Sequence, residues 1–219
     1  MHELYRLASG IFVWIAILGF AAGMIGRLAH LAMTARKKDP VVYQYFSLYY
    51  ALRSILHWII PFASTGMRAH PIITIVAFVF HICLIVTPLF AAAHVILVME
   101  SWNLSWWYLP DPAADVMTGL VILGCLFFLI RRIVQKNVRY LSTPGDFVLI
   151  ALVAAPFVTG FWTYHQWYGY ETAGILHMLS GELMLLCLPF TRLFHMALWP
   201  FTRGYAGSEF GGLRRSRDW

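Results

Sequence analysis

The sequence has few charged residues, and this shortage narrows what the chain can be. Charged residues make up 12% of its 219 positions and hydrophobic residues 60%, whereas about a quarter of a soluble domain is charged. A soluble globular fold is therefore excluded. Lys and Arg, 16 in total, outnumber the 10 acidic residues, but most of them lie in short loops beside apolar runs. That placement indicates membrane orientation and not nucleic-acid binding.

Cysteine is also scarce. The chain has 3 cysteines, Cys83, Cys125 and Cys187, and each lies in a different apolar run. No Cys-x-x-Cys-His motif occurs, so covalent attachment of a c-type haem is excluded. Iron–sulfur ligation would need four grouped thiolates. We expect these side chains to pack in the interior.

Long apolar runs, by contrast, are abundant. We place five membrane spans at residues 10–33, 71–98, 115–132, 146–164 and 172–199, because about 20 apolar residues cross a bilayer. No cleavable signal-peptide pattern precedes the first run. The sequence thus predicts an all-α integral membrane protein: a five-transmembrane-helix bundle that forms a single domain over residues 1–219.

Residues 43–61 are apolar on several faces but contain Arg53 and His57 and end at Pro61. A sixth span here would have to bury both polar side chains in lipid, which is costly. We interpret this stretch as a helix at the membrane surface or tucked under the bundle.

Basic residues gather after the first span, after the third span and in the C-terminal tail. They are Arg36, Lys37, Lys38, Arg131, Arg132, Lys136, Arg139, Arg203, Arg214, Arg215 and Arg217. Cytoplasmic loops carry this excess of Lys and Arg. We therefore expect a multi-pass protein of the bacterial inner (cytoplasmic) membrane, with its N-terminus outside and its C-terminus in the cytoplasm.

Four of the 9 histidines fall inside predicted spans: His81 and His94 in the second, His177 and His195 in the fifth. His177 and His195 are eighteen residues apart, which would place both on one face of one helix, about 27 Å apart along its axis. The hydrocarbon core is roughly 30 Å thick. The spacing therefore predicts two cofactors, one above the other. The remaining histidines, His2, His30, His57, His70 and His165, fall at ends, boundaries or in loops.

Two antiparallel helices with two histidines each can hold two haems, because each iron takes one imidazole from either side. We therefore predict two haems between the second and fifth helices. His94 is expected to pair with His177 near the outer face, and His81 with His195 near the cytoplasm.

The spacing within the second span demands a distortion. Thirteen residues between His81 and His94 turn an ideal helix about 140° away from a common face. We predict a kink or bulge, which Pro88 can supply. His70 would share a face with His81 but lies at the membrane boundary, so His94 is preferred as the ligand.

These residues resemble a known family, the membrane cytochrome b (gamma) subunit of respiratory nitrate reductase, with related cytochrome b subunits of transmembrane redox complexes in sulfate-reducing bacteria. The likeness is strongest at His-Met-Leu-Ser-Gly (177–181) and Pro-Phe-Thr-Arg-Leu-Phe-His (189–195). It extends to Ser-Thr-Pro-Gly-Asp (142–146) and covers roughly residues 78–203. The chain departs from the family in a wider histidine spacing in the second span, and in acidic residues at 109–115 where the family has a basic one.

The resemblance implies an electron-transfer subunit of a quinone oxidoreductase complex with two b-type haems. His94 and His177 would be axial ligands of the outer haem iron, and His81 and His195 those of the inner one. It also implies a site for menaquinone or another quinone beside the outer haem. Partner subunits would carry iron–sulfur clusters, multihaem cytochrome c, or both. From its position, Arg192 either reaches a haem propionate or snorkels to the interface.

Acidic residues near the outer face are candidates for proton transfer. Glu182 lies in the fifth span, where it is expected to be protonated, hydrogen-bonded or part of a proton path. Glu100, Asp111 and Asp115 are candidate proton exits or simply solvated loop charges.

Other functional classes remain open. A haem-free membrane anchor subunit would use the same helices and show no visible absorbance. A secondary transporter would need inverted repeats, and no repeat is present. Among haem proteins, a cytochrome of the b561 or formate dehydrogenase gamma type shares the bundle principle but not the fifth-span motif.

Overall fold

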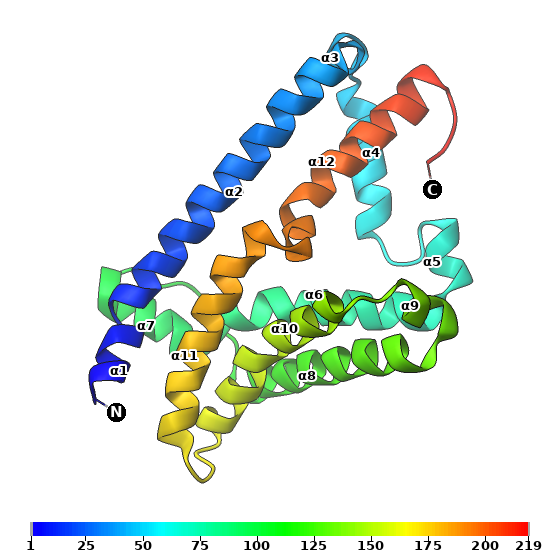
Figure 1. Cartoon of the computed structure of the whole chain (residues 1–219). Coiled ribbons are helices and arrows are strands. Elements are labelled where there is room, and N and C mark those ends of the chain that lie inside the picture. Colours follow the sequence, from blue (N-terminus) through cyan, green and yellow to red (C-terminus); the bar gives the residue numbers. More distant parts are fainter. Residues whose placement is uncertain (1, 219) are drawn as a thin grey trace. The chain divides into compact units, whose positions relative to one another are not determined.

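The computed structural model describes residues 2–218, and every regular element in that range is a helix (Figure 1). The elements are α1 (His2–Ala8), α2 (Ile11–Lys38), α3 (Pro40–Tyr45), α4 (Leu48–Ile59), α5 (Thr65–Ala69), α6 (Pro71–Phe90), α7 (Ala92–Trp102), α8 (Asp111–Val134), α9 (Lys136–Leu141), α10 (Pro144–Tyr164), α11 (Tyr170–Cys187), the 3₁₀ turns η1 (Leu188–Phe190) and η2 (Arg192–Phe194), α12 (His195–Gly207), and the π-helical η3 (Ser208–Leu213).

Five helical stretches of the described chain are long and apolar enough to cross a membrane. They are His2–Lys38, Pro71–Trp102, Asp111–Val134, Pro144–Tyr164 and Tyr170–Phe190. The all-α fold with five candidate membrane-spanning helices is thus confirmed. The first four contain the predicted spans 10–33, 71–98, 115–132 and 146–164, extended by a turn or more at several ends.

The fifth span differs from the prediction of one helix over 172–199. α11 ends at Cys187, two 3₁₀ turns follow, and α12 begins at His195. Pro189 lacks the N–H that a helix needs, and Thr191 has an extended backbone, with φ −117° and ψ −173°. His177 and His195 therefore lie on two helices. The prediction that they share one face of one helix is wrong.

The second span is interrupted at Ala91, whose extended backbone (φ −64°, ψ 132°) separates α6 from α7. A distortion between His81 and His94 was predicted, and it is confirmed. It falls three residues after Pro88, which itself stays within α6. His81 and His94 thus belong to two helical segments, so the 140° angle that an ideal continuous helix would put between them does not apply.

The described residues form two compact units, one of residues 2–12 and 76–184 and the other of residues 13–75 and 185–218. In the first unit, α8 and α10 lie side by side (Figure 1). α6 approaches α8 closely at Gly124, where an added Cβ would stand 2.5 Å from the Phe80 ring. Cys83 and Cys125 are buried free thiols, as predicted, and Cys187 is half-buried.

The start of α10 is fixed by a capping box. The Thr143 backbone N–H and hydroxyl both donate to Asp146, at 2.8 and 3.0 Å. Asp146 is buried and also faces the Arg132 guanidinium at 3.6 Å. Arg132 in turn donates to the Ser142 hydroxyl at 3.0 Å. The Ser-Thr-Pro-Gly-Asp motif therefore ties the end of α8 to the beginning of α10.

In the second unit, α4 and α12 pack along each other (Figure 1). Small residues line this contact: a Cβ on Gly207 would stand 2.4 Å from the Ser54 Cβ, and one on Gly204 would stand 3.6 Å from the Ala51 Cβ. The predicted helix over 43–61 appears as α3 and α4, with a break at Phe46 and Ser47. His57 lies inside α4, and His30 lies inside α2 rather than near its end.

Candidate functional site

The break at Ala91 leaves the carbonyl groups of residues 88–90 without their helical partners, because the chain turns away before it can supply the i+4 amides. An unpaired carbonyl is costly in a membrane. Each of the three carbonyls is satisfied by a donor from later in the chain. Pro88 accepts from His94 Nδ1 at 2.7 Å, Leu89 from Trp106 Nε1 at 2.8 Å, and Phe90 from the Leu109 N–H at 2.8 Å.

His94 faces His177 across the first unit. Their ring centroids are 5.8 Å apart, and their planes are 14° from parallel. Both side chains are half-buried. The structure thus brings together the two residues that the sequence analysis assigned to the outer haem, from α7 and α11.

His177 is held by the neighbouring helix α10. Its Nδ1 donates to the carbonyl oxygen of Pro156 at 2.7 Å. Gly160 leaves room for the ring, because a Cβ there would stand 2.8 Å from the same Nδ1. A carbonyl oxygen can only accept, so Nδ1 carries the proton and Nε2 keeps its lone pair.

The other two predicted ligands, His81 and His195, also have Nδ1 hydrogen-bonded to a main-chain carbonyl. His81 donates from Nδ1 to the Ala77 carbonyl at 2.7 Å, and His195 donates to the Arg192 carbonyl at 2.9 Å. A histidine that binds a metal through Nε2 commonly donates its Nδ1 proton to such an acceptor. His81 lies in the first unit and His195 in the second, so their pairing stays a prediction.

The distance between the His94 and His177 rings can be compared with that of two imidazoles bound to one metal ion. Metal–nitrogen bonds of about 2 Å on each side, plus the distance from each nitrogen to its ring centre, give a centroid separation of about 6 Å. The observed separation is 5.8 Å. Both Nδ1 atoms are already engaged, so the lone pair of each ring is left on Nε2.

Sequence reasoning missed one pair at the ends of the third and fourth spans. His165 Nε2 lies 2.9 Å from the Asp115 carboxylate, and each side chain is about one-third exposed. The His165 ring also stacks on Trp167, with planes 22° from parallel. The sequence predicted His165 at an end or in a loop, and Asp115 as a proton exit or a solvated loop charge. Their predicted positions at the same membrane face were the signal that could have linked them.

Glu182 lies in α11 with its Oε1 buried and without a hydrogen-bond partner among the described residues. A buried ionised carboxylate in that setting is costly. The expectation of a hydrogen-bonded Glu182 is therefore not met at this oxygen. His70 lies between α5 and α6, where its carbonyl accepts from Thr74, so it is a boundary residue as expected.

Fold and site together define a class, an all-helical protein with five candidate membrane spans and an opposed histidine pair between two of them. The chain is 34% identical over 220 residues to a protein of Nitratidesulfovibrio vulgaris (strain Hildenborough), and the match covers 97% of each sequence. It belongs to the same family as that protein, whose name states no activity. No protein-family model matches the sequence.

Proposed function

We propose that this protein is a dihaem cytochrome b subunit of a respiratory complex in the bacterial inner membrane. It passes electrons between a quinone pool and partner redox subunits. The observation that carries the proposal is the His94–His177 pair, with centroids 5.8 Å apart and near-parallel planes. Two imidazoles on two different spans, each with its Nδ1 on a main-chain carbonyl, could supply both axial ligands of a haem iron.

The chain's own part is to hold and tune the ligands. Backbone carbonyls of Pro88 and Pro156 accept the Nδ1 protons of His94 and His177, which fixes ring orientation and raises the basicity of Nε2. When bound, a b-type haem supplies reversible one-electron transfer at its iron. With haem bound, a more basic imidazole nitrogen would stabilise the oxidised iron, so these two carbonyls would lower the reduction potential of the site.

His81 and His195 are the proposed ligands of a second b-type haem. Each has its Nδ1 proton on a main-chain carbonyl, as in the first pair. Arg192 precedes His195 by three residues, and we assign its guanidinium to a haem propionate, with which it can form two parallel hydrogen bonds.

The electron partners follow from the resemblance to the nitrate reductase gamma family. Menaquinone or another quinone binds beside the His94–His177 haem, and iron–sulfur or multihaem cytochrome c subunits exchange electrons with the complex. The basic loops support an N-terminus outside and a C-terminus in the cytoplasm. Electron transfer between haems at two depths would then move charge across the membrane.

The deciding experiment is a dithionite-reduced minus oxidised difference spectrum of the purified full chain, with pyridine haemochrome quantification. We expect two b-type haems per polypeptide. A colourless polypeptide from haem-replete cells would overturn the proposal and favour a haem-free membrane anchor.

Single substitutions locate the haems. We expect His94→Ala and His177→Ala each to remove one haem, and the same one, because both ligate one iron. His30→Ala is the matched control, since His30 is an exposed histidine inside α2, and it should retain both haems. Full haem content in both His94→Ala and His177→Ala would contradict the assignment.

A further inference from the structure

Arg27 is a charged residue within the first candidate membrane span, His2–Lys38. It precedes the C-terminal end of α2 by eleven residues, or about 16 Å along the axis. A charge in such a segment usually pairs with other polar groups and serves a function.

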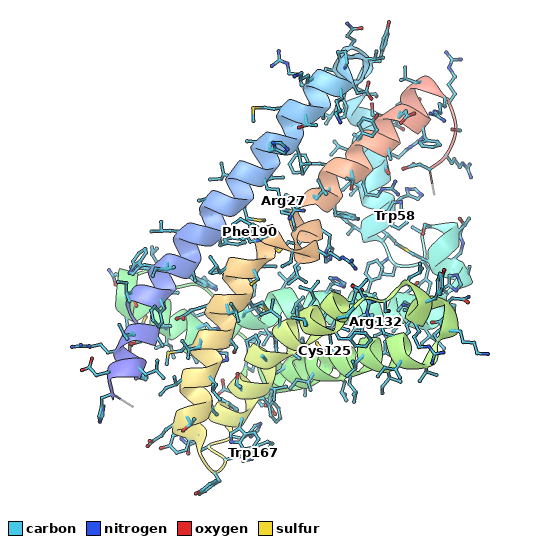
Figure 2. The ribbon with its side chains drawn as sticks, in the orientation of Figure 1. Arg27, Trp58, Cys125, Arg132, Trp167 and Phe190 are labelled. Carbon is cyan, nitrogen blue, oxygen red and sulfur yellow. The ribbon has the colours of Figure 1, made fainter. Side chains whose placement is uncertain are left out.

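The Arg27 guanidinium reaches the break in the fifth span (Figure 2). Its Nη1 donates to the carbonyl oxygens of Pro189 and Thr191, the latter at 3.2 Å. Its Cζ lies 4.3 Å from the ring centroid of Phe194, a cation–π contact. Pro189 and Phe194 are almost fully buried. The Arg27 side chain thus contacts both the main-chain carbonyls and the Phe194 ring of the segment between α11 and α12.

Two glycines on the same face of α2 bring the helix close to this break. Gly19 and Gly23 precede Arg27 at intervals of four residues, which places all three on one face. A Cβ on Gly19 would stand 2.4 Å from the Leu186 side chain, and one on Gly23 would stand 2.7 Å from the Pro189 ring. The approach that positions Arg27 therefore depends on small residues one and two turns before it.

The break that Arg27 holds comes directly before the proposed ligand. His195 is the first residue of α12, and its Nδ1 donates to the Arg192 carbonyl within η2. The position of that carbonyl follows from the extended Thr191, whose own carbonyl accepts from Arg27. The orientation of the His195 ring is thus linked through three residues of backbone to the guanidinium of the first span.

We propose that Arg27 is a positioning residue that holds the break before His195, and so sets the orientation of the imidazole and of Arg192 at the second haem. This inference rests on the proposed function. Arg27 does not touch the iron; it acts through the backbone of residues 189–194.

The test uses the purified full chain and the electron paramagnetic resonance signals and midpoint potentials of its low-spin haems. The signal that disappears in His195→Ala identifies the haem in question. We expect Arg27→Met to shift or remove that signal and to leave the His94–His177 signal unchanged. Arg36→Met is the matched control, because Arg36 is an exposed arginine of the same helix, and both of its signals should remain.

Arg27→Lys separates positioning from folding. Lysine keeps the charge but lacks the planar fork that spans two carbonyls, so we expect both haems to be retained and only the His195-dependent signal to shift. If both haem signals of Arg27→Met match those of Arg36→Met, this inference is overturned and the proposed function is not. Equal disturbance of both signals in Arg27→Lys would also overturn it. Absence of haem from the unmodified chain would overturn both this inference and the proposed function.

Discussion

Gly160 and His177 lie so close that a Cβ on the glycine would stand 2.8 Å from the imidazole Nδ1. The contact joins two candidate membrane-spanning helices, α10 and α11, at the ring that faces His94. It also leaves the Pro156 carbonyl accessible to the Nδ1 proton, which fixes the tautomer that ligation needs. A residue without a side chain is thus part of the candidate site.

Gly160→Ala tests this contact. The added methyl group would push the His177 ring away from Pro156, so we expect haem affinity at this site to fall by roughly 10–100-fold, the usual cost of losing an outer-shell partner. Haem titration of the apoprotein, followed at the Soret band, measures the change. Gly119→Ala is the control, since a Cβ there meets nothing within 4 Å. Unchanged affinity in Gly160→Ala would show that the ring does not depend on this space.

Asp146→Asn should destabilise the first unit. The buried carboxylate accepts from Thr143 and faces Arg132, so the change weakens a helix cap and leaves the guanidinium without its counter-charge. We expect a loss of about 1–3 kcal/mol in unfolding free energy, measured by thermal or denaturant unfolding in detergent.

The control for that prediction is Asp115→Asn. Asp115 also faces a basic partner, His165, at 2.9 Å, but both side chains are about one-third exposed. A solvent-screened pair contributes less than about 1 kcal/mol. If Asp146→Asn and Asp115→Asn lose equal unfolding free energy, burial does not explain the difference expected between the two ion pairs.

Gly207→Ala should weaken the packing of α12 on α4. The new Cβ would stand 2.4 Å from the Ser54 Cβ and 2.6 Å from the Tyr50 carbonyl oxygen, so the helices must separate, at a cost of about 1–3 kcal/mol. Gly204→Ala lies one turn earlier, with its nearest contacts at 3.6 Å. It should be neutral or stabilising by up to about 1 kcal/mol, because alanine favours helix over glycine. Melting temperatures of the two variants test this contrast, and a Gly207→Ala protein as stable as Gly204→Ala would refute it.

The orientation of the chain can be checked with reporter fusions. The basic loops predict a cytoplasmic C-terminus, so green fluorescent protein fused after Trp219 should fluoresce, and alkaline phosphatase at the same position should be inactive. Alkaline phosphatase fused after Trp107, in the loop after the second span, should be active. The opposite pattern would invert the proposed sidedness of the two haems.

The sequence predicted the second-span break better than the fifth-span one. Pro88 and the wide spacing of His81 and His94 called for a distortion, and the structure places it at Ala91. Pro189 is the same kind of signal, but it stands inside a long apolar run whose hydropathy predicts one continuous helix over 172–199. The helices break at Ala91 in the second span and at Thr191 in the fifth. The exact position depends on which distant groups form hydrogen bonds with the backbone carbonyls that the break leaves unpaired. The amino-acid pattern around each proline does not contain that information.

Hydropathy alone was enough to locate the five candidate spans, because each polar residue placed in lipid adds its own free-energy cost, independent of its distant neighbours. The same local cost singled out His81, His94, His177 and His195. The antiparallel course of the second and fifth spans also predicted that His94 pairs with His177. Only the tertiary structure decided that Gly160 admits the ring and that Arg27 holds carbonyls 162 and 164 residues away in the chain. Those contacts depend on helix rotation and approach, which packing sets and spacing along the sequence does not.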